Sequence, residues 1–181
     1  MNHFTIFLFL AALVGSGTAS VAQTTSPYAG QEQRTIKALS DREISDLTEG
    51  RGMGLAKAAE LNGYPGPMHV LELAESLDLS DQQRAKMQEL FAAMKAEAIP
   101  LGERLIVQEA DLDKQFVSET ITPASLVAST DAIGTTHATL RRTHLKYHLF
   151  TLEVLTPAQV QRYAELRGYM TGTQHSHGRH H

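Results

Sequence analysis

Apolar residues in the middle of the chain recur every three or four positions, which is the spacing of an amphipathic helix. From Ser80 this pattern continues to residue 117 with a period of about 3.5 residues, and it predicts one long helix with a seam like that of a coiled coil. Pro100 should kink this helix, because proline lacks the backbone N–H and clashes with the preceding turn. The seam consists of Met87, Leu90, Phe91, Met94, Leu101, Leu105, Leu112 and Phe116.

A second long helix is predicted from Pro123 to about Val154, after a turn at 118–121. Thr122 can cap its first turn, and proline suits its first position. Shorter helices are predicted at 40–47, 55–61, 67–77 and 157–169. No segment shows the sustained alternation of a half-buried strand. The sequence therefore predicts an all-α fold, in which the long helices form a bent antiparallel hairpin flanked by short helices.

The apolar stripe and the charge of the predicted fold indicate which class of partner it can bind. One hairpin exposes too much apolar stripe to stand alone, so we expect a homodimer. The chain has a formal net charge of −4, and its Lys and Arg are scattered. It therefore lacks the clustered positive charge on which nucleic-acid binding rests. A second copy is thus the predicted partner.

Two short segments share the pattern Leu-Ser/Thr-x-x-Gln, at 79–83 and at 155–159. In each, the hydroxyl can accept a hydrogen bond from the backbone N–H three residues on, while the Gln reaches back to the same turn. Both segments therefore predict helix N-termini. Each follows a stretch that contains a histidine, His69 before the first segment and His148 before the second.

This pair of motifs resembles the LTxxQ proteins of the bacterial envelope, and the similarity covers about 67–169. The group includes the Spy/CpxP chaperones and the CnrX-type periplasmic heavy-metal resistance sensors, and it implies an antiparallel dimer whose two motif helices begin side by side. In the sensors, metal ligands come from a His pair at i, i+4 before the first motif and a His and Met at i, i+4 before the second. His69 and His148 match this plan, but Leu73 and Leu152 replace the second ligand of each pair. The alternatives near His69 are Glu72 and Met68.

Three histidines of the second long helix share one face. Steps of seven and eleven residues return a helix to within about 20° of its starting direction, so His137, His144 and His148 project together. His144 and His148 form an i, i+4 pair that can chelate one ion, and neutral imidazole suits Zn²⁺, Ni²⁺, Co²⁺ and Cu²⁺. The alternative is that His137 and His144 are partly buried seam residues bonded to the backbone or to a partner. If the motif helices begin side by side, His69 can approach His148.

The chain has no cysteine, which excludes thiolate metal sites and disulfides. The glycines at 50, 52 and 54 predict a hinge between short helices, because no strand precedes them as in a phosphate-binding loop. No serine lies in a nucleophile elbow. We therefore expect a protein that is not an enzyme, with no catalytic or organic-cofactor residues.

The two ends of the chain differ from the middle. An apolar run at 4–14 and Ser-Val-Ala at 20–22 predict a signal peptide at 1–22, cleaved after Ala22, and hence a periplasmic protein; an uncleaved anchor is the alternative. Residues 23–39 are predicted to form a flexible lead-in, and residues 40–172 a single all-α domain. Residues 173–181 are predicted to be a His-rich tail that can chelate metal; the alternative is that they are a purification tag. The tail histidines are His175, His177, His180 and His181.

Together these features predict a periplasmic protein that binds a divalent transition metal in envelope metal resistance or sensing. The candidate metal ligands are His69, Glu72, His137, His144, His148 and the four tail histidines. The alternative is a chaperone or stress adaptor of the Spy/CpxP kind. Beyond a second copy, the partners to expect are a membrane-bound regulator or unfolded envelope proteins.

Overall fold

A computed structural model describes residues 26–169, and the predicted signal peptide and His-rich tail lie outside this range. The described residues form six α-helices and the short 3₁₀ helix η1 (Gln31–Gln33), with an isolated bridge between Ile36 and Leu39 and no strand. The predicted all-α class is thus confirmed. None of these helices combines the length and the apolar composition that crossing a membrane would require.

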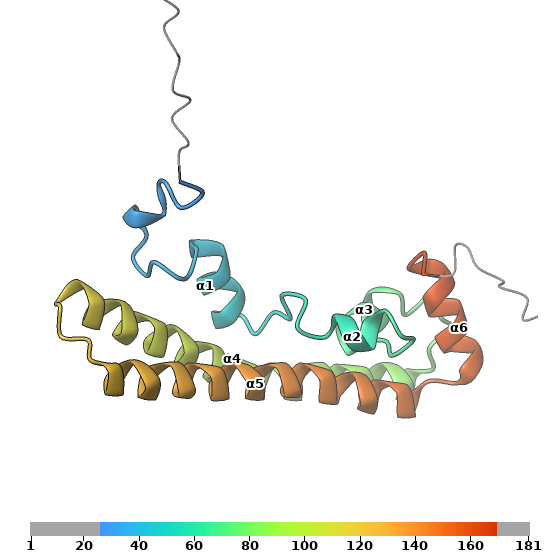
Figure 1. Cartoon of the computed structure of the whole chain (residues 1–181). Helices are drawn as coiled ribbons and strands as arrows, with labels where there is room; N and C mark the ends of the chain where they lie inside the picture. Colours follow the sequence, from blue (N-terminus) through green and yellow to red (C-terminus); the bar gives the residue numbers. More distant parts are fainter. Residues whose placement is uncertain (1–25, 170–181) are drawn as a thin grey trace, which may run out of the picture.

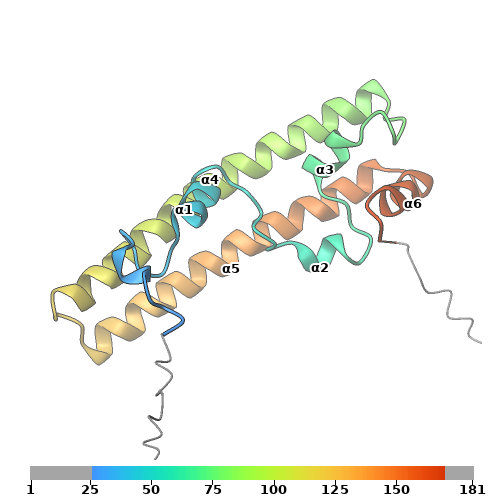
Figure 2. The same cartoon turned by 90° about the horizontal axis from the view of Figure 1, so that it is seen from above.

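The two longest helices, α4 (Asp81–Val117) and α5 (Pro123–Val154), lie side by side (Figures 1 and 2). They run in opposite directions, because Gln83 Nε2 near the start of α4 donates to Val154 O at the end of α5, at 3.0 Å. Between the ends, Lys146 Nζ lies 2.6 Å from Glu97 Oε2. Helix α4 continues through Pro100.

Shorter helices lie over one face of this pair or at its end (Figure 1). They are α1 (Asp41–Thr48), α2 (Lys57–Glu60), α3 (Pro67–Glu72) and α6 (Pro157–Leu166). The helix predicted at 67–77 ends at Glu72, because the chain then tightens into turns such as Ala74 N to Leu71 O at 3.2 Å. These turns place Leu77 and Leu79 in the core.

The segment before α1 carries part of the predicted lead-in. Residues 26–39 contain η1 and turns, and Ile36 is buried. Lys37 Nζ lies 3.7 Å from Asp113 Oδ2 and so links the segment to α4. This part of the lead-in therefore contacts α4.

The two Leu-Ser/Thr-x-x-Gln segments open α4 and α6 and face each other. Ser80 and Thr156 each accept a hydrogen bond from the backbone N–H three residues on, at 3.2 Å, and both capping boxes are complete. The amides of Gln83 and Gln159 then bond reciprocally, with N–O distances of 2.8 and 3.0 Å. Each motif thus caps its own helix and also joins the two helix starts.

The core is divided into two clusters along α4. One surrounds Met87 at the motif end, and the other packs Leu47 of α1 against Ala98, Leu105 and Leu140. The predicted homodimer rests on apolar stripes of the hairpin, and on α4 this stripe is buried within one chain at Met87, Leu90, Met94 and Leu105, where α1, α3 and α5 contact α4. The apolar side chains still exposed toward the α4–α5 connection are Val107, Phe116, Val117, Leu126 and Val127.

Candidate metal site

A cavity of about 550 Å³ lies between α5 and the segment that carries α1, α2 and α3. Three of the predicted histidines line it: His69, His144 and His148. Its apolar lining includes Phe91 and Met94 of α4. The fold thus brings together histidines that are up to 79 residues apart in the sequence.

His144 is buried in this cavity, with 3% of its surface exposed. Its ring lies against Gly52, where an added Cβ would be 3.7 Å from Nδ1. Its Nε2 atom is buried and has no hydrogen-bond partner among residues 26–169. Burial lowers the pKa of His144 below its ordinary value of 6.5, and the nearby His148 lowers it further. The imidazole is therefore held in the neutral form, which is the form that ligates metals.

His148 is buried on the adjacent turn of α5 and is oriented by the backbone. Its Nδ1 lies 2.6 Å from Tyr64 O. Because a carbonyl can only accept, Nδ1 carries the hydrogen, so Nε2 is the nitrogen that carries the lone pair when the ring is neutral. The ring also packs against Gly66, where an added Cβ would be 2.9 Å from Cε1.

The remaining predicted residues of the described chain lie differently. His69 is partly exposed and lines the cavity. Its Nδ1 lies 2.9 Å from Glu72 Oε2, so Glu72 contacts the Nδ1 side of the ring. His137 is exposed and does not line the cavity. It shares the face of His144 but lies two turns, or about 10 Å, nearer the start of α5. The structure therefore does not place His137 in the cavity with His144 and His148, and its role as a ligand stays a prediction.

Within 26–169, no group of three or more His, Asp or Glu side chains is close enough to hold a metal ion. The four tail histidines lie outside the described residues. The described chain thus offers two buried imidazoles on successive turns of α5, with His69 lining the same cavity.

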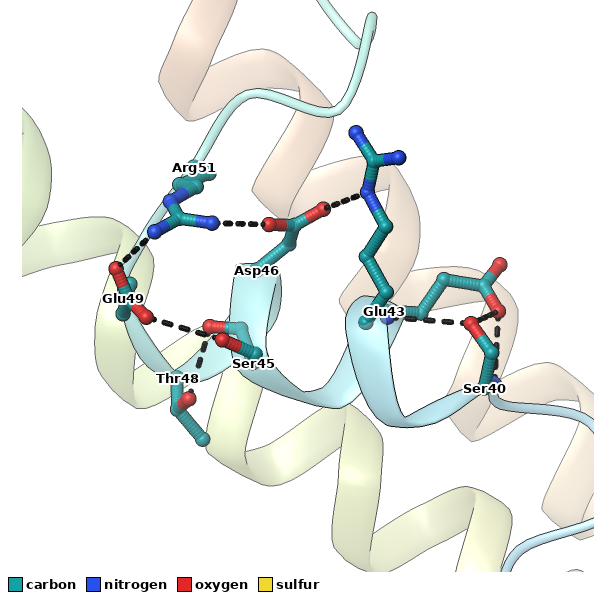
Figure 3. A network of polar contacts seen from close by, with 8 residues as sticks. Ser40, Glu43, Ser45, Asp46, Thr48, Glu49 and Arg51 are labelled. Atoms are coloured by element: carbon teal, nitrogen blue, oxygen red, sulfur yellow. Dashed lines mark hydrogen bonds and ion pairs between the residues drawn. The ribbon is translucent and has the colours of Figure 1, made fainter. Parts of the chain in front are cut away.

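Figure 3 shows a polar network on α1, and its members Asp46, Glu49 and Arg51 also line the cavity. Asp46 accepts a hydrogen bond from Arg51 at 2.8 Å, and Arg51 also bonds Glu49 at 2.6 Å. These bonds tie the segment after α1 back onto the helix. Gly50 has a φ of 65°, a left-handed conformation that favours glycine. The glycine series therefore forms a turn that places Gly52 over His144.

Glu60 is a residue of the cavity that sequence reasoning missed. It lies on α2, lines the cavity, and has a side chain that is only 12% exposed. Its Oε2 is 3.8 Å from His148 Nδ1. A glutamate in a four-residue helix carries no sequence signal of burial, because the burial comes from the packing of α2 against α5.

Comparison with models of known protein families, with curated proteins and with solved structures finds no match for this chain. The resemblance to the LTxxQ proteins rests on the two motifs and on the positions of His69 and His148. It stays a prediction.

The lowered pKa of His144 predicts a loss of stability in weak acid. Below pH 6.5 the unfolded chain takes up a proton at this histidine that the folded chain resists. The contribution of His144 to the free energy of unfolding is therefore fully present above pH 6.5. It falls as the pH drops toward 5, by at most about 1.4 kcal/mol per pH unit. Urea unfolding of the metal-free protein from pH 7.5 to 5 measures this slope. His144→Leu should flatten it and the exposed His137→Leu should not; equal slopes in both variants would contradict the assignment.

Proposed function

We propose that this chain is a periplasmic protein that binds a divalent transition metal, in envelope metal resistance or sensing, and that it is not an enzyme. The observation that carries the proposal is the pair of buried imidazoles on α5. His144 Nε2 has no partner among the described residues, and His148 has its Nδ1 occupied and its Nε2 lone pair available. Neutral imidazole nitrogens of this kind are ligands for Zn²⁺, Ni²⁺, Co²⁺ and Cu²⁺.

His69 is the third ligand of the proposed site. Its Nδ1 donates to Glu72, since a carboxylate can only accept, and this again leaves Nε2 as the ligating atom. His69 is less buried than the α5 pair, so its side chain is the freer one to move toward a bound ion. We assign the remaining coordination positions to solvent.

The finer architecture belongs to the same proposal. We take α4 and α5 as the two arms of a bent hairpin that pairs with a second copy. The exposed Val107, Phe116, Val117, Leu126 and Val127 support this pairing, since a dimer would cover apolar surface there. Light scattering should show a dimer, and a stable monomer at micromolar concentration would contradict it.

The same exposed residues favour a second candidate function. A chaperone of the Spy/CpxP kind would use them to hold unfolded envelope proteins, with no requirement for a metal. Suppression of aggregation by the protein, unchanged by chelator and lost on replacing Phe116 and Val117 with serine, would favour this alternative.

Calorimetric titration with the four metals tests the proposed function. The protein is compared with a full-length tail variant that combines His175→Ala, His177→Ala, His180→Ala and His181→Ala. Helix α5 already holds its two imidazoles one turn apart, whereas any residue that must be fixed on binding costs about 1–2 kcal/mol. We expect the tail variant to show lower stoichiometry but to keep the tighter site. Loss of all binding in the tail variant would contradict a site in the cavity.

A further inference from the structure

Glu60 lies in a partly buried polar cluster that joins α2, α5 and α6. Its Oε1 accepts hydrogen bonds from the hydroxyls of Tyr163 and Tyr169, the latter at 3.0 Å, and Arg167 Nε lies 3.6 Å away. Burial and the bond to Glu60 raise the pKa of Tyr163, so this phenol stays a donor. These contacts fix the carboxylate through one of its two oxygens.

The other oxygen of Glu60 is directed toward the metal site. Oε2 is buried, has no hydrogen-bond partner among the described residues, and lies 3.8 Å from His148 Nδ1. It is on the Nδ1 side of the ring, whereas a metal would bind at Nε2. Glu60 in this position is therefore not a metal ligand, and any effect on the metal must pass through His148.

We propose that Glu60 is a positioning residue that acts through His148 and supplies the negative charge behind its imidazole. This inference rests on the proposed function. Tyr64 O already fixes the hydrogen on Nδ1, so the added contribution of Glu60 is electrostatic. A cation bound at Nε2 makes the Nδ1–H more positive, and a carboxylate beside that group stabilises the charged complex.

The surroundings strengthen this interaction. The side chains of Glu60 and His148 are only 12% and 11% exposed, so water screens their interaction weakly. The charge of Arg167 opposes that of Glu60, but it lies at the other carboxylate oxygen. Loss of an outer partner of a ligating histidine typically weakens metal binding about 10- to 100-fold.

The test separates the effect of side-chain shape at position 60 from the effect of its negative charge on metal affinity. Zn²⁺ is the probe, and the full-length tail variant is the parent protein. Glu60→Gln keeps the size and an acceptor for the tyrosines but removes the charge, and it should weaken Zn²⁺ binding about 10- to 100-fold. Glu60→Asp keeps the charge and should stay much closer to the parent. The exposed Glu165→Gln on α6 is the matched control and should bind as the parent does.

The outcomes separate this inference from the proposed function. Parent-like affinity in Glu60→Gln, or a larger loss in Glu60→Asp, would overturn the role of charge while leaving the metal site intact. Failure of the parent itself to bind Zn²⁺ would overturn the proposed function. If Glu60→Gln does not fold, Arg167→Gln gives the reverse test: removing the opposing charge should tighten Zn²⁺ binding several-fold, and unchanged or weaker binding would overturn the inference.

Discussion

Replacing Gly102 with alanine should destabilise the protein by at least about 1–3 kcal/mol, the usual range for overpacking. Gly102 lies on α4 where α1 crosses it, and an added Cβ would be 2.4 Å from Leu47 O and 2.9 Å from Leu47 C. Both atoms belong to the backbone, so no side-chain rotation can relieve the clash. Either α1 shifts away from α4 or the helix bends, and both disturb the core around Leu47. Urea denaturation measures the loss as a lower midpoint.

The matched control is Gly134→Ala on α5. No described atom other than the helix's own nearby backbone lies within 4 Å of a Cβ at Gly134, and alanine favours a helix interior by about 1 kcal/mol relative to glycine. This variant should therefore be more stable than the wild type. If Gly102→Ala were stabilised to the same degree, α1 would not pack on α4 in solution. Because α1 forms a wall of the cavity, Gly102→Ala should also weaken metal binding.

The second large effect is expected at the metal site. In the tail variant, His144→Ala together with His148→Ala should weaken metal binding at least about 100-fold, or about 2.8 kcal/mol. The two substitutions remove the only paired imidazoles that a described helix presents to the cavity. His137→Ala, which removes an exposed histidine of the same helix, should leave the affinity unchanged. Calorimetric titration at pH 7.5 measures all three proteins, with circular dichroism as a check of folding.

Acid should weaken the same binding. Imidazole must be neutral to ligate, so affinity falls as the pH is lowered, and the lowered pKa of His144 places its part of this fall below pH 6.5. If the tail substitutions remove all binding from the wild type while the α5 double substitution leaves its binding unchanged, the α5 histidines are structural. The chaperone alternative would then be favoured.

Much of the helical structure could be predicted because its signals are local. Ser80 and Thr156 cap their helices within one turn, and Pro123 occupies the first position of α5 as expected. The pairing of His144 and His148 likewise follows from helix periodicity alone. These features depend on residues three or four positions apart, whose geometry the helix itself sets.

The rest depends on how the short helices dock, which no local pattern specifies. His137 matches the face of His144, yet the cavity does not extend to it. Glu60 is buried only because α2 packs near α5 and α6 brings Tyr163 to it. The helix at 67–77 stops early because turns bring Leu77 and Leu79 into the core. In each case tertiary packing, which the local sequence pattern does not specify, determines whether a residue reaches the cavity, becomes buried or ends a helix.

X-ray absorption spectroscopy of the tail variant loaded with one equivalent of Zn²⁺ tests the central claim most directly. The four tail histidines are absent from this protein, so any imidazole signal comes from the folded domain or the residues before it. Our account predicts at least two imidazole nitrogens at about 2.0–2.1 Å from the metal, and fewer in the protein that also lacks His144 and His148. A shell of oxygen atoms alone, or an imidazole count that the α5 substitutions leave unchanged, would contradict it.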